Sequence, residues 1–329
     1  MLVAVAAFMT MQFTTTEVGF RGVDGFELKG TFIEPMAAKN VPAVLLLPGS
    51  GPTDRDGNTP LLPMKVDNLK QIAESLASVG IASLRFDKRA IHSYSDKWPK
   101  DMGEIAQFFS WEHFVGDAKL AYEFLKTQPG VDASRVGVLG HSEGALIALR
   151  VACDPAENVK ALIMVGGQGR PLDVVISQQL REKLPQQLPA DQVPLYMDYA
   201  TRAMAQIKKD ATIPPDPPAG LKGLFNPSTL VFLHQNFQDD PAALASQFKG
   251  DALVVNGEFD NQISAELDAK ALHTAFAERK IGDVKLVIVP GASHALKSTP
   301  NRETDAMEGP MVPLSLKAID DWCVEHLKG

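Results

Sequence analysis

Residues 134–150 read SRVGVLGHSEGALIALR, and this stretch decides how the chain folds. Residues 136–139 are a short apolar, β-branched run that predicts a buried strand, and residues 145–153 have the composition of a buried helix. Between them lies the pattern GxSxG, with a glycine two positions before and two positions after Ser142. Small residues at those positions let the backbone turn sharply without clashes. The stretch therefore predicts a strand, a tight turn and a helix, with Ser142 exposed on the turn.

This placement makes Ser142 a candidate nucleophile. A serine on such a turn stands above the sheet at the start of a helix, where the backbone N–H of Glu143 can face a developing oxyanion. The alternative is a glycine-flanked turn in which Ser142 is an ordinary helix N-cap. The strand and the helix on either side favour the nucleophile.

The rest of the sequence repeats the alternation of strand and helix. We expect strands at residues 42–47, 81–86, 159–165, 251–256 and 284–289, and helices at 67–79, 111–126, 264–279 and 312–327. Residues 13–20 and 26–33 alternate apolar and polar side chains and predict an antiparallel hairpin. The fold class is therefore α/β, with a mostly parallel, doubly wound sheet whose ligands bind beyond the carboxyl ends of the strands.

The alternation stops between residues 168 and 250. Helical stretches at 173–184 and 192–209 are followed by the proline cluster IPPDPP, and no buried parallel strand is evident. We interpret residues 168–250 as a mostly helical cap segment inserted after the sixth strand. The two flanking parts, 1–167 and 251–329, would form the core domain.

Composition limits the classes of function. The chain has 329 residues, 45% of them hydrophobic, and a formal net charge of −8, so no basic stripe is available for nucleic acid. Its two cysteines, Cys153 and Cys323, are far apart, and we expect buried thiols and no disulfide framework or cysteine metal site. The apolar N-terminus lacks an early Lys or Arg and is too short to cross a bilayer, so we expect a soluble protein. The compartment, the oligomeric state and the choice between Met1 and Met11 as the start stay open.

A serine nucleophile needs a base, which is nearly always a histidine oriented by a carboxylate. His294, in VPGASHAL, follows the last predicted strand, and a loop histidine there can reach Ser142. Asp260, in NGEFDNQI, lies just beyond the preceding strand, with Glu258 as the reserve choice for the acid. Each residue alone could be a loop or turn residue. Their types, order and strand-end positions together predict a Ser142–His294–Asp260 triad.

A second oxyanion donor should come from the glycine-containing loop after the third strand. We nominate the N–H of Ser50, with Gly51 as the alternative. The run 54–58, DRDGN, could contact substrate, but ion pairs and Asx turns within the loop are the preferred interpretation. The run 85–89, RFDKR, is interpreted as structural support at a strand end.

These residues together resemble the α/β-hydrolase superfamily, and more closely its bacterial serine esterases with an LLLPGSGPxDRDGN segment. The resemblance runs from about Phe13 onward and includes, in order, PGSGPTDRDGN, RFDKRAIHSYS, GHSEG, GEFD and PGASH. It implies a carboxylic ester hydrolase with the same triad and a lid between the sixth and seventh strands. One departure is the run 87–93, DKRAIHS, where such proteins have DKRGxGxS, so we expect a different turn there and carry no substrate role over to it.

We therefore expect a serine hydrolase that cleaves carboxylic esters, short-chain or aryl, through an acyl-enzyme. The small-molecule ester is the only partner expected, with no metal or organic cofactor. Peptidase or amidase activity is a rival, although relatives of prolyl oligopeptidase usually carry an N-terminal propeller for which there is no room. Thioesterase and lactonase activities stay open. A non-catalytic receptor on the same fold is the alternative from another class.

Overall fold

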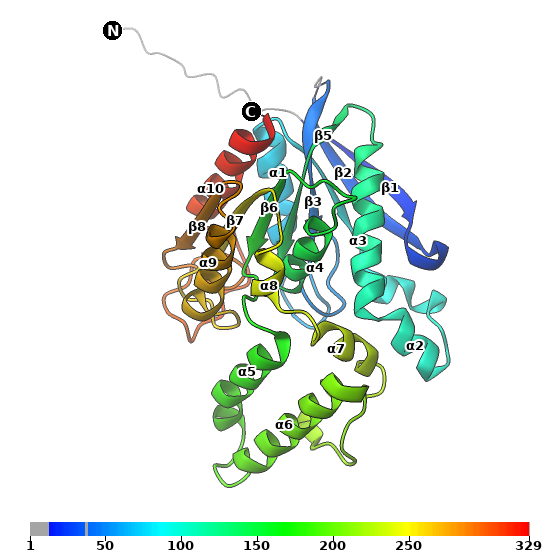
Figure 1. The fold of residues 1–329 in the computed structure, drawn as a ribbon, viewed down its shortest axis with the longest axis vertical. Helices are drawn as coiled ribbons and strands as arrows, with labels where there is room; N and C mark the ends of the chain where they lie inside the picture. The colour runs from blue at the N-terminus through cyan, green and yellow to red at the C-terminus, as the bar shows by residue number, and fades with distance from the viewer. Residues whose placement is uncertain (1–12, 37–38, 329) are drawn as a thin grey trace.

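The computed structural model describes residues 13–36 and 39–328 of the 329-residue chain. Figure 1 shows a twisted sheet with helices on both faces and a further group of helices beyond one end of the strands. The predicted α/β class with a mostly parallel, doubly wound sheet is confirmed. The apolar N-terminus, including the choice between Met1 and Met11, lies outside the described residues.

Within these residues the sheet has eight strands in the order β1-β2-β4-β3-β5-β6-β7-β8. They are β1 Phe13–Arg21, β2 Glu27–Pro35, β3 Val41–Leu47, β4 Ala82–Phe86, β5 Val131–His141, β6 Ala161–Val165, β7 Asp251–Gly257 and β8 Val284–Val289. β1 and β2 form the predicted hairpin, β2 is also antiparallel to β4, and the remaining neighbours are parallel. The strands from β3 to β8 thus all end at the same edge, which is where their loops meet.

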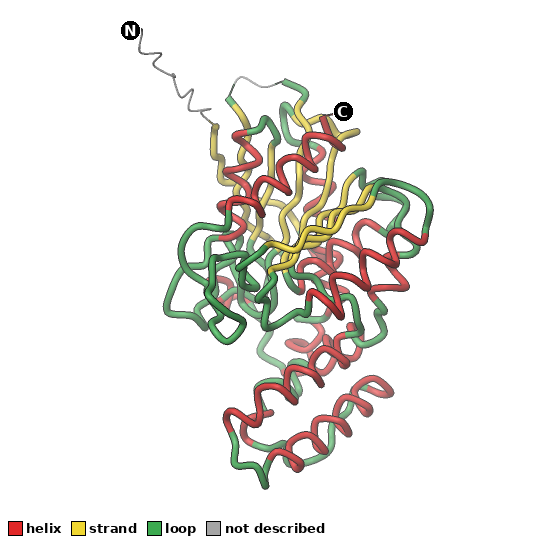
Figure 2. Tube along the Cα trace, turned by 90° about the vertical axis from the view of Figure 1, so that its left-hand side faces the viewer, coloured by secondary structure: helices red, strands yellow, loops and turns green. Residues whose placement is uncertain are grey.

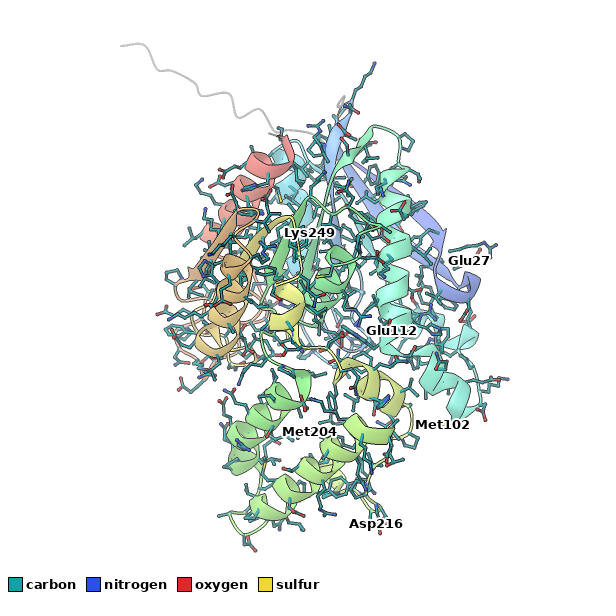
Figure 3. The ribbon with its side chains drawn as sticks, in the orientation of Figure 1. Glu27, Met102, Glu112, Met204, Asp216 and Lys249 are labelled. Carbon is teal, nitrogen blue, oxygen red and sulfur yellow. The ribbon has the colours of Figure 1, made fainter. Side chains whose placement is uncertain are left out.

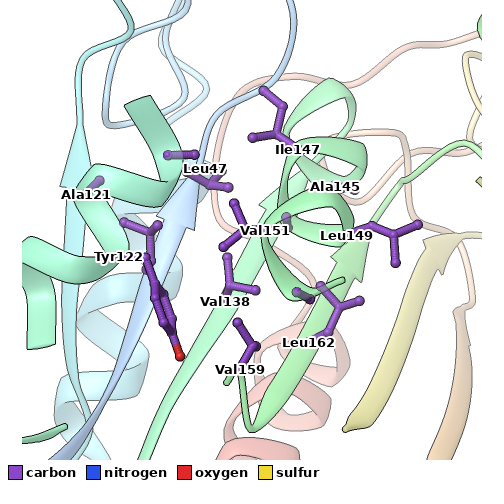
Figure 4. Packing of buried hydrophobic residues seen from close by; sticks show 14 of the residues in the cluster. Leu47, Ala121, Tyr122, Val138, Ala145, Ile147, Leu149, Val151, Val159 and Leu162 are labelled. Atoms are coloured by element: carbon purple, nitrogen blue, oxygen red, sulfur yellow. The ribbon is translucent and has the colours of Figure 1, made fainter. Parts of the chain in front are cut away.

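Helices cover both faces of the sheet because the strands are apolar on both sides. Helices α1 Asn68–Ser78 and α10 Pro313–Cys323 pack on one face, and α3 Trp111–Lys126, α4 Glu143–Ala152 and α9 Lys270–Glu278 pack on the other. Figure 4 shows the second layer, where Tyr122 of α3 and Ile147 of α4 lie against Leu47 and Val138 of the strands. The helix predicted at 264–279 begins with a π-helical turn, and the last helix ends with another.

Between β6 and β7 the structure has four helices and no strand. They are α5 Leu172–Gln187, α6 Val193–Asp210, α7 Leu230–Asn236 and α8 Pro241–Ala245. The first two match the predicted helical stretches, whereas α7, α8 and the short α2 Met102–Phe108 were not anticipated. Helix α8 packs on α4 and α9, so the chain has returned to the main body before β7 begins.

The other three helices lie beyond the carboxyl ends of the strands and have a hydrophobic cluster of their own. Figure 2 shows them as a layer below the sheet, and Figure 3 labels Met204, which lies on α6 within this layer. The cluster contains Ile176, Tyr199, Ala200, Ala203, Met204, Ile207, Leu221, Phe225, Leu233 and Phe237. These side chains pack on one another apart from the two clusters that flank the sheet.

Two ion-pair clusters attach this layer to the main body, and we call them the first and second anchors. In the first anchor, fully buried Asp268 accepts hydrogen bonds from the guanidinium of Arg170, at 2.6 and 2.9 Å, and from the backbone N–H of Gly169. In the second, Asp239, just after α7, accepts from Arg150 at 2.8 Å and from Nε1 of Trp111 at 2.8 Å. The anchors hold both ends of the segment that carries α5, α6 and α7.

The structure also bears on the two cysteines and on membrane-spanning helices. Both cysteines are free thiols, but only Cys323 is buried, because Cys153 follows the last turn of α4 and is half-buried there. Among residues 13–36 and 39–328, none of the helices combines the length and the apolar character needed to cross a bilayer.

Candidate active site

The backbone at Ser142 is strained in the way a sharp strand-to-helix turn requires. Its φ of 56° and ψ of −124° lie outside the regions that a serine ordinarily adopts. A Cβ on Gly140 would overlap the backbone of Gly144, and a Cβ on Gly144 would lie 2.5 Å from the carbonyl oxygen of Leu47. The strand β5, the turn and the helix α4 can therefore approach this closely only because both flanking residues are glycine.

His294 and Asp260 meet at the same edge of the sheet. Asp260 follows β7, His294 follows β8, and Nδ1 of His294 lies 2.8 Å from Oδ2 of Asp260. Both side chains are almost fully buried. The other carboxylate oxygen, Oδ1, accepts the backbone N–H groups of Gln262 and Ile263 at 2.8 Å each. Since the carboxylate accepts at Nδ1, the neutral ring carries its proton there and Nε2 is left as the acceptor.

The electrostatics of the pair favour a basic imidazole. Burial alone would lower the pKa of His294, but the negative charge of Asp260 and its hydrogen bond outweigh that cost and raise the pKa above its ordinary value. The reserve acid, Glu258, does not contact His294, because its Oε2 accepts the backbone N–H of Gly291. The geometry thus pairs the histidine with Asp260.

The end of β6 brings Ser142 and His294 to the same place. The N–H of Ser142 donates to the carbonyl oxygen of Val165 at 2.9 Å, and a Cβ on the next residue, Gly166, would lie 3.1 Å from Cε1 of His294. Ser142 and His294, both within the described residues, share no hydrogen bond. Such bonds are often long before substrate binds.

His141 supports the histidine loop, a role that the sequence analysis did not assign to it. Its Nε2 lies 3.0 Å from the carbonyl oxygen of His294, and the two rings are 4.8 Å apart. Burial lowers the pKa of His141 to about 3, so the ring is neutral and Nε2 carries the proton that it donates. A histidine beside a GxSxG serine gives no sequence signal for this contact, because its partner lies 153 positions away.

The loop after β3 lies directly against Ser142. A Cβ on Gly49 would be 3.3 Å from Cβ of Ser142. In the described part of the chain, neither the N–H of Ser50 nor that of Glu143 has a hydrogen-bond partner. Both residues line a cavity together with Ser142. Two unpaired backbone donors beside a serine can bind an oxyanion.

Lys88, just after β4, joins this loop to the turn at Ser142. Its Nζ donates to the carbonyl oxygen of Gly49 at 2.5 Å and to Oε1 of Glu143 at 3.0 Å. The lysine is 3% exposed. The Glu143 side chain is therefore a partner of Lys88 and is not free in the cavity.

Two cavities meet at Glu143 and Phe232. The first has a volume of about 240 Å³ and is lined by Ser50, Ser142 and residues of α5 and α7, with Gln262 and Ile263 on the side of Asp260. The second has a volume of about 310 Å³ and lies by the ends of β3 and β4. Its walls are mostly apolar and include the aromatic side chains of Trp98, Phe109, Phe114 and Phe232. Ser142 thus stands beside one cavity, and a second, more apolar cavity continues past Glu143.

The DRDGN run is held by its own contacts, in agreement with its preferred interpretation. Oδ1 of Asp54 accepts the N–H groups of Asp56 and Asn58, which is an Asx-type turn. Arg55 pairs with Asp87 at 2.8 Å and with Glu17 at 2.7 Å, and Asp56 pairs with Arg85. These contacts fix the loop that follows Ser50 and Gly51.

A possible metal-binding group lies elsewhere. Among the described residues, Asp251, Asp283 and His326 bring ligand-type atoms within 4.8 Å of one another. Asp251 opens β7, so this group is at the opposite end of the strand from Asp260. An Asp251–His326 contact of 3.1 Å already accounts for the two side chains.

Comparisons with known proteins identify a family and a curated relative. The family model described as serine aminopeptidase, S33 matches residues 64–300. Esterase EstD of Thermotoga maritima is 28% identical over 279 residues, which are 84% of this chain and 60% of that protein. The chain thus spans about 60% of the length of this curated relative.

Solved structures show the same fold. Est1E from Butyrivibrio proteoclasticus superposes with a TM-score of 0.60 at 14% identity, covering 95% of this chain and 99% of that one. A hypothetical protein from Pseudomonas aeruginosa gives 0.58 at 14% identity, covering 96% and 94%. At such identities the likeness shows the fold alone. Taken with the family match, the chain belongs to the serine aminopeptidase S33 family of hydrolases and has the α/β-hydrolase fold.

Proposed function

We propose that the protein hydrolyses carboxylic esters through an acyl-enzyme formed on Ser142. The observation that carries this proposal is the buried His294–Asp260 pair beside a strained serine that lines a cavity, with Nε2 of the histidine lacking a hydrogen-bond partner among residues 13–36 and 39–328. The esterase relative supports the reaction class.

In this mechanism Oγ of Ser142 attacks the ester carbonyl while Nε2 of His294 takes its proton. The N–H groups of Ser50 and Glu143 hold the oxyanion, and His294 then protonates the departing alcohol. Asp260 keeps the proton of the neutral ring on Nδ1 and stabilises the imidazolium. Water activated by the same histidine releases the acid and restores Ser142. Both oxyanion donors are backbone groups, so each step of this mechanism uses only residues of this chain and water.

The family description raises a second candidate, an aminopeptidase. Such an enzyme must hold the free amino group of a peptide, normally with a carboxylate. Among the described residues, the only carboxylate that lines the cavity beside Ser142 is that of Glu143, and Lys88 already pairs with it. This pairing favours an uncharged ester over a peptide amino terminus.

The two cavities suggest how an ester is oriented. The alcohol must leave on the side of His294, which is the side of Gln262 and Ile263 in the 240 Å³ cavity. The acyl group then extends to the opposite side, toward the 310 Å³ cavity with its partly aromatic walls. We therefore infer that the preferred acyl group is apolar or aromatic. The cap segment, residues 168–250, would act as the lid, since α5 and α7 contribute the outer wall of the first cavity.

The test is covalent labelling and turnover. A fluorophosphonate should label the wild type, and p-nitrophenyl acetate and butyrate should be hydrolysed. Ser142→Ala should abolish labelling and lower kcat by roughly five to six orders of magnitude. Ser246→Ala, which removes an exposed hydroxyl on α8's C-terminal side, is the matched control and should behave as wild type.

If the wild type neither labels nor turns over either ester, the hydrolase proposal fails, and the fold serves as a receptor. Turnover of thioester and lactone substrates, compared with turnover of the p-nitrophenyl esters, shows which of these bonds the enzyme cleaves fastest. Faster release of an N-terminal amino acid from a peptide than of butyrate from its ester would favour the aminopeptidase.

A further inference from the structure

Lys88 is a buried ammonium that the proposed mechanism does not use. Its Nζ donates to the carbonyl oxygen of Gly49, in the peptide group whose N–H belongs to Ser50, and to the side chain of Glu143. It therefore contacts the surroundings of both proposed oxyanion donors. Burying a charge is costly unless its partners repay the cost. The location of this charge, between the two donors, therefore needs a reason.

We propose that Lys88 is the positioning residue of the oxyanion hole, orienting the N–H of Ser50 through the Gly49 carbonyl and the N–H of Glu143 through its carboxylate. This proposal rests on the proposed ester hydrolysis. Lys88 itself contacts neither the ester carbonyl nor the reacting atoms in it.

The first link is the Gly49–Ser50 peptide. The peptide group is planar and trans, so its C=O and N–H point in opposite directions. The hydrogen bond to Lys88 holds the carbonyl of Gly49 at 2.5 Å, and this fixes where the N–H of Ser50 points. Glycine at position 49 resists rotation of this peptide less than any other residue would. Without Lys88 the donor would lose its fixed direction.

The second link is Glu143, the first residue of α4, whose N–H has no hydrogen-bond partner in the part of the chain that the structure describes. Its carboxylate is held at 3.0 Å by the same ammonium. An anionic carboxylate beside a developing oxyanion would oppose catalysis, and the pairing with Lys88 offsets that charge. The ammonium also polarises the Gly49–Ser50 amide, which makes its N–H a stronger donor.

The lysine is itself held on both sides. Its neighbour Asp87 accepts the side chain of Arg55 and donates its backbone N–H to Lys29. On the other side, Arg89 forms a buried bidentate pair with Asp117 of α3, at 2.6 and 2.7 Å. The Nζ of Lys88 also lies 5.4 Å from the ring centre of Phe114. Three consecutive charged residues thus fix three different segments, and Lys88 is the one directed at the active site.

The experiment compares Lys88→Met with the double variant Lys88→Met/Glu143→Gln and with Glu143→Gln alone. The double variant leaves no uncompensated buried charge, so it is the form expected to fold well. The readouts are kcat and KM for p-nitrophenyl butyrate, and the affinity of a trifluoromethyl ketone, which binds as an oxyanion. Circular dichroism and the thermal midpoint report folding. Lys119→Met, which removes a lysine paired with Asp154 on the surface of α3, is the matched control.

We expect Lys88→Met to lower kcat by roughly 100-fold, within the range seen when an oxyanion donor is removed, with KM changed by less than about threefold. Affinity for the ketone should fall in proportion to kcat/KM. The double variant should recover part of the loss, because the unpaired carboxylate is gone, yet remain about tenfold below Glu143→Gln. A merely structural lysine would lower the thermal midpoint without this parallel loss of ketone affinity.

The inference is overturned if the double variant equals Glu143→Gln in both kcat and ketone affinity, or if Lys88→Met is as active as Lys119→Met. Either result leaves ester hydrolysis intact, because the wild type still labels and turns over. A wild type that does neither removes the proposed function instead.

Discussion

At the scale of single residues, the site depends on which atoms hold His294. Its ring is bound by Asp260 and its backbone carbonyl by His141, so the ring and the main chain are restrained independently. The contact with Asp260 raises the pKa of the His294 ring, whereas the contact with His141 positions the backbone of the loop that carries it. Two substitutions separate these effects.

The first prediction concerns pH. The proposed base is the neutral imidazole, so kcat/KM should fall as the pH drops through the pKa of His294, which the charge of Asp260 raises above its ordinary value. His141 cannot produce this decline, because its pKa is about 3. Asp260→Asn removes the charge, so the acidic limb of the pH profile should move to lower pH, while the plateau drops by about 10⁴.

The matched control for the pH profile is Glu258→Gln, on the same loop. The Glu258 carboxylate accepts the N–H of Gly291, and the amide oxygen of glutamine can still accept that bond. A wild-type profile for Glu258→Gln is expected. An inactive Glu258→Gln beside a fully active Asp260→Asn would reverse the assignment of the acid.

The second prediction concerns His141. His141→Phe keeps an aromatic ring but loses the donor to the His294 carbonyl, so the histidine loop should shift and kcat should fall by about tenfold. His141→Gln can place an N–H near the same oxygen and should lose less. Steady-state kinetics on both variants make the comparison. Equal activity of His141→Phe and wild type would show that the loop does not need this contact.

At the scale of elements, the loops after the strands build the two cavities. The acyl group is proposed to enter the cavity walled by Trp98, Phe109 and Phe114, which pack edge to face in part, with Trp98 and Phe109 at 5.1 Å. Trp98 and Phe109 come from the segment between β4 and α3, and Phe114 comes from α3 itself. The acyl preference would then be set by the main body of the protein as well as by the helices over it.

The third prediction follows from that wall. Phe109→Ala should lower kcat/KM for the p-nitrophenyl ester of phenylacetic acid by about tenfold relative to p-nitrophenyl acetate, because an aromatic contact and apolar surface are lost. Phe124→Ala is the control, since Phe124 stacks on Phe20 away from both cavities. A parallel loss for both esters would place the acyl group elsewhere.

The elements also show what could be predicted from the sequence. Buried strands and long amphipathic helices were recovered because their apolar patterns are long, and the strand-end loops of Asp260 and His294 followed from them. The short α7 and α8 carry too few turns for a periodicity to be read. α2 carried a local signal, since Asp101 caps the N–H groups of Gly103 and Glu104, but it spans only seven residues.

Long-range contacts could not be predicted. Lys88 reaches Gly49 and Glu143 across 39 and 55 positions, and nothing in RFDKR indicates those partners. The same limit applies to Arg170 and Asp268, which are 98 positions apart. Pairing of buried charges is decided by where the strands bring loops together, and a local pattern carries no information about it.

At the scale of the whole molecule, the helices over the site are attached through the two anchors. Asp268 accepts hydrogen bonds from the guanidinium and backbone N–H of Arg170, in the loop between β6 and α5, and Asp239 accepts from Arg150 of α4. Each anchor sets one end of the outer wall of the cavity beside Ser142. Their strength should therefore affect substrate binding as well as stability.

The fourth prediction tests the first anchor. Asp268→Ala leaves Arg170 without its buried partner and should lower the free energy of unfolding by about 3 kcal/mol, measured by urea denaturation. At temperatures where it remains folded, KM should rise more than kcat falls, because the wall of the cavity loosens. Asp198→Ala removes an exposed pair with Arg202 on α6 and should change stability by less than about 1 kcal/mol. Equal effects of Asp268→Ala and Asp198→Ala on stability and on KM would mean that the Arg170–Asp268 pair does not hold the helices over the site.

The separate hydrophobic cluster of α5, α6 and α7 has a consequence for engineering and for divergence. Because α5 and α6 pack mainly within this cluster, while α7 also packs on α2 and α3 of the main body, the sequence of α5 and α6 can change without repacking the sheet. A foreign segment spliced between Arg170 and Asp239, with both anchoring residues and the body-facing Phe232 kept, should yield a chimera that folds and takes a different range of esters. The two charged attachments would then serve as natural exchange junctions for new specificities.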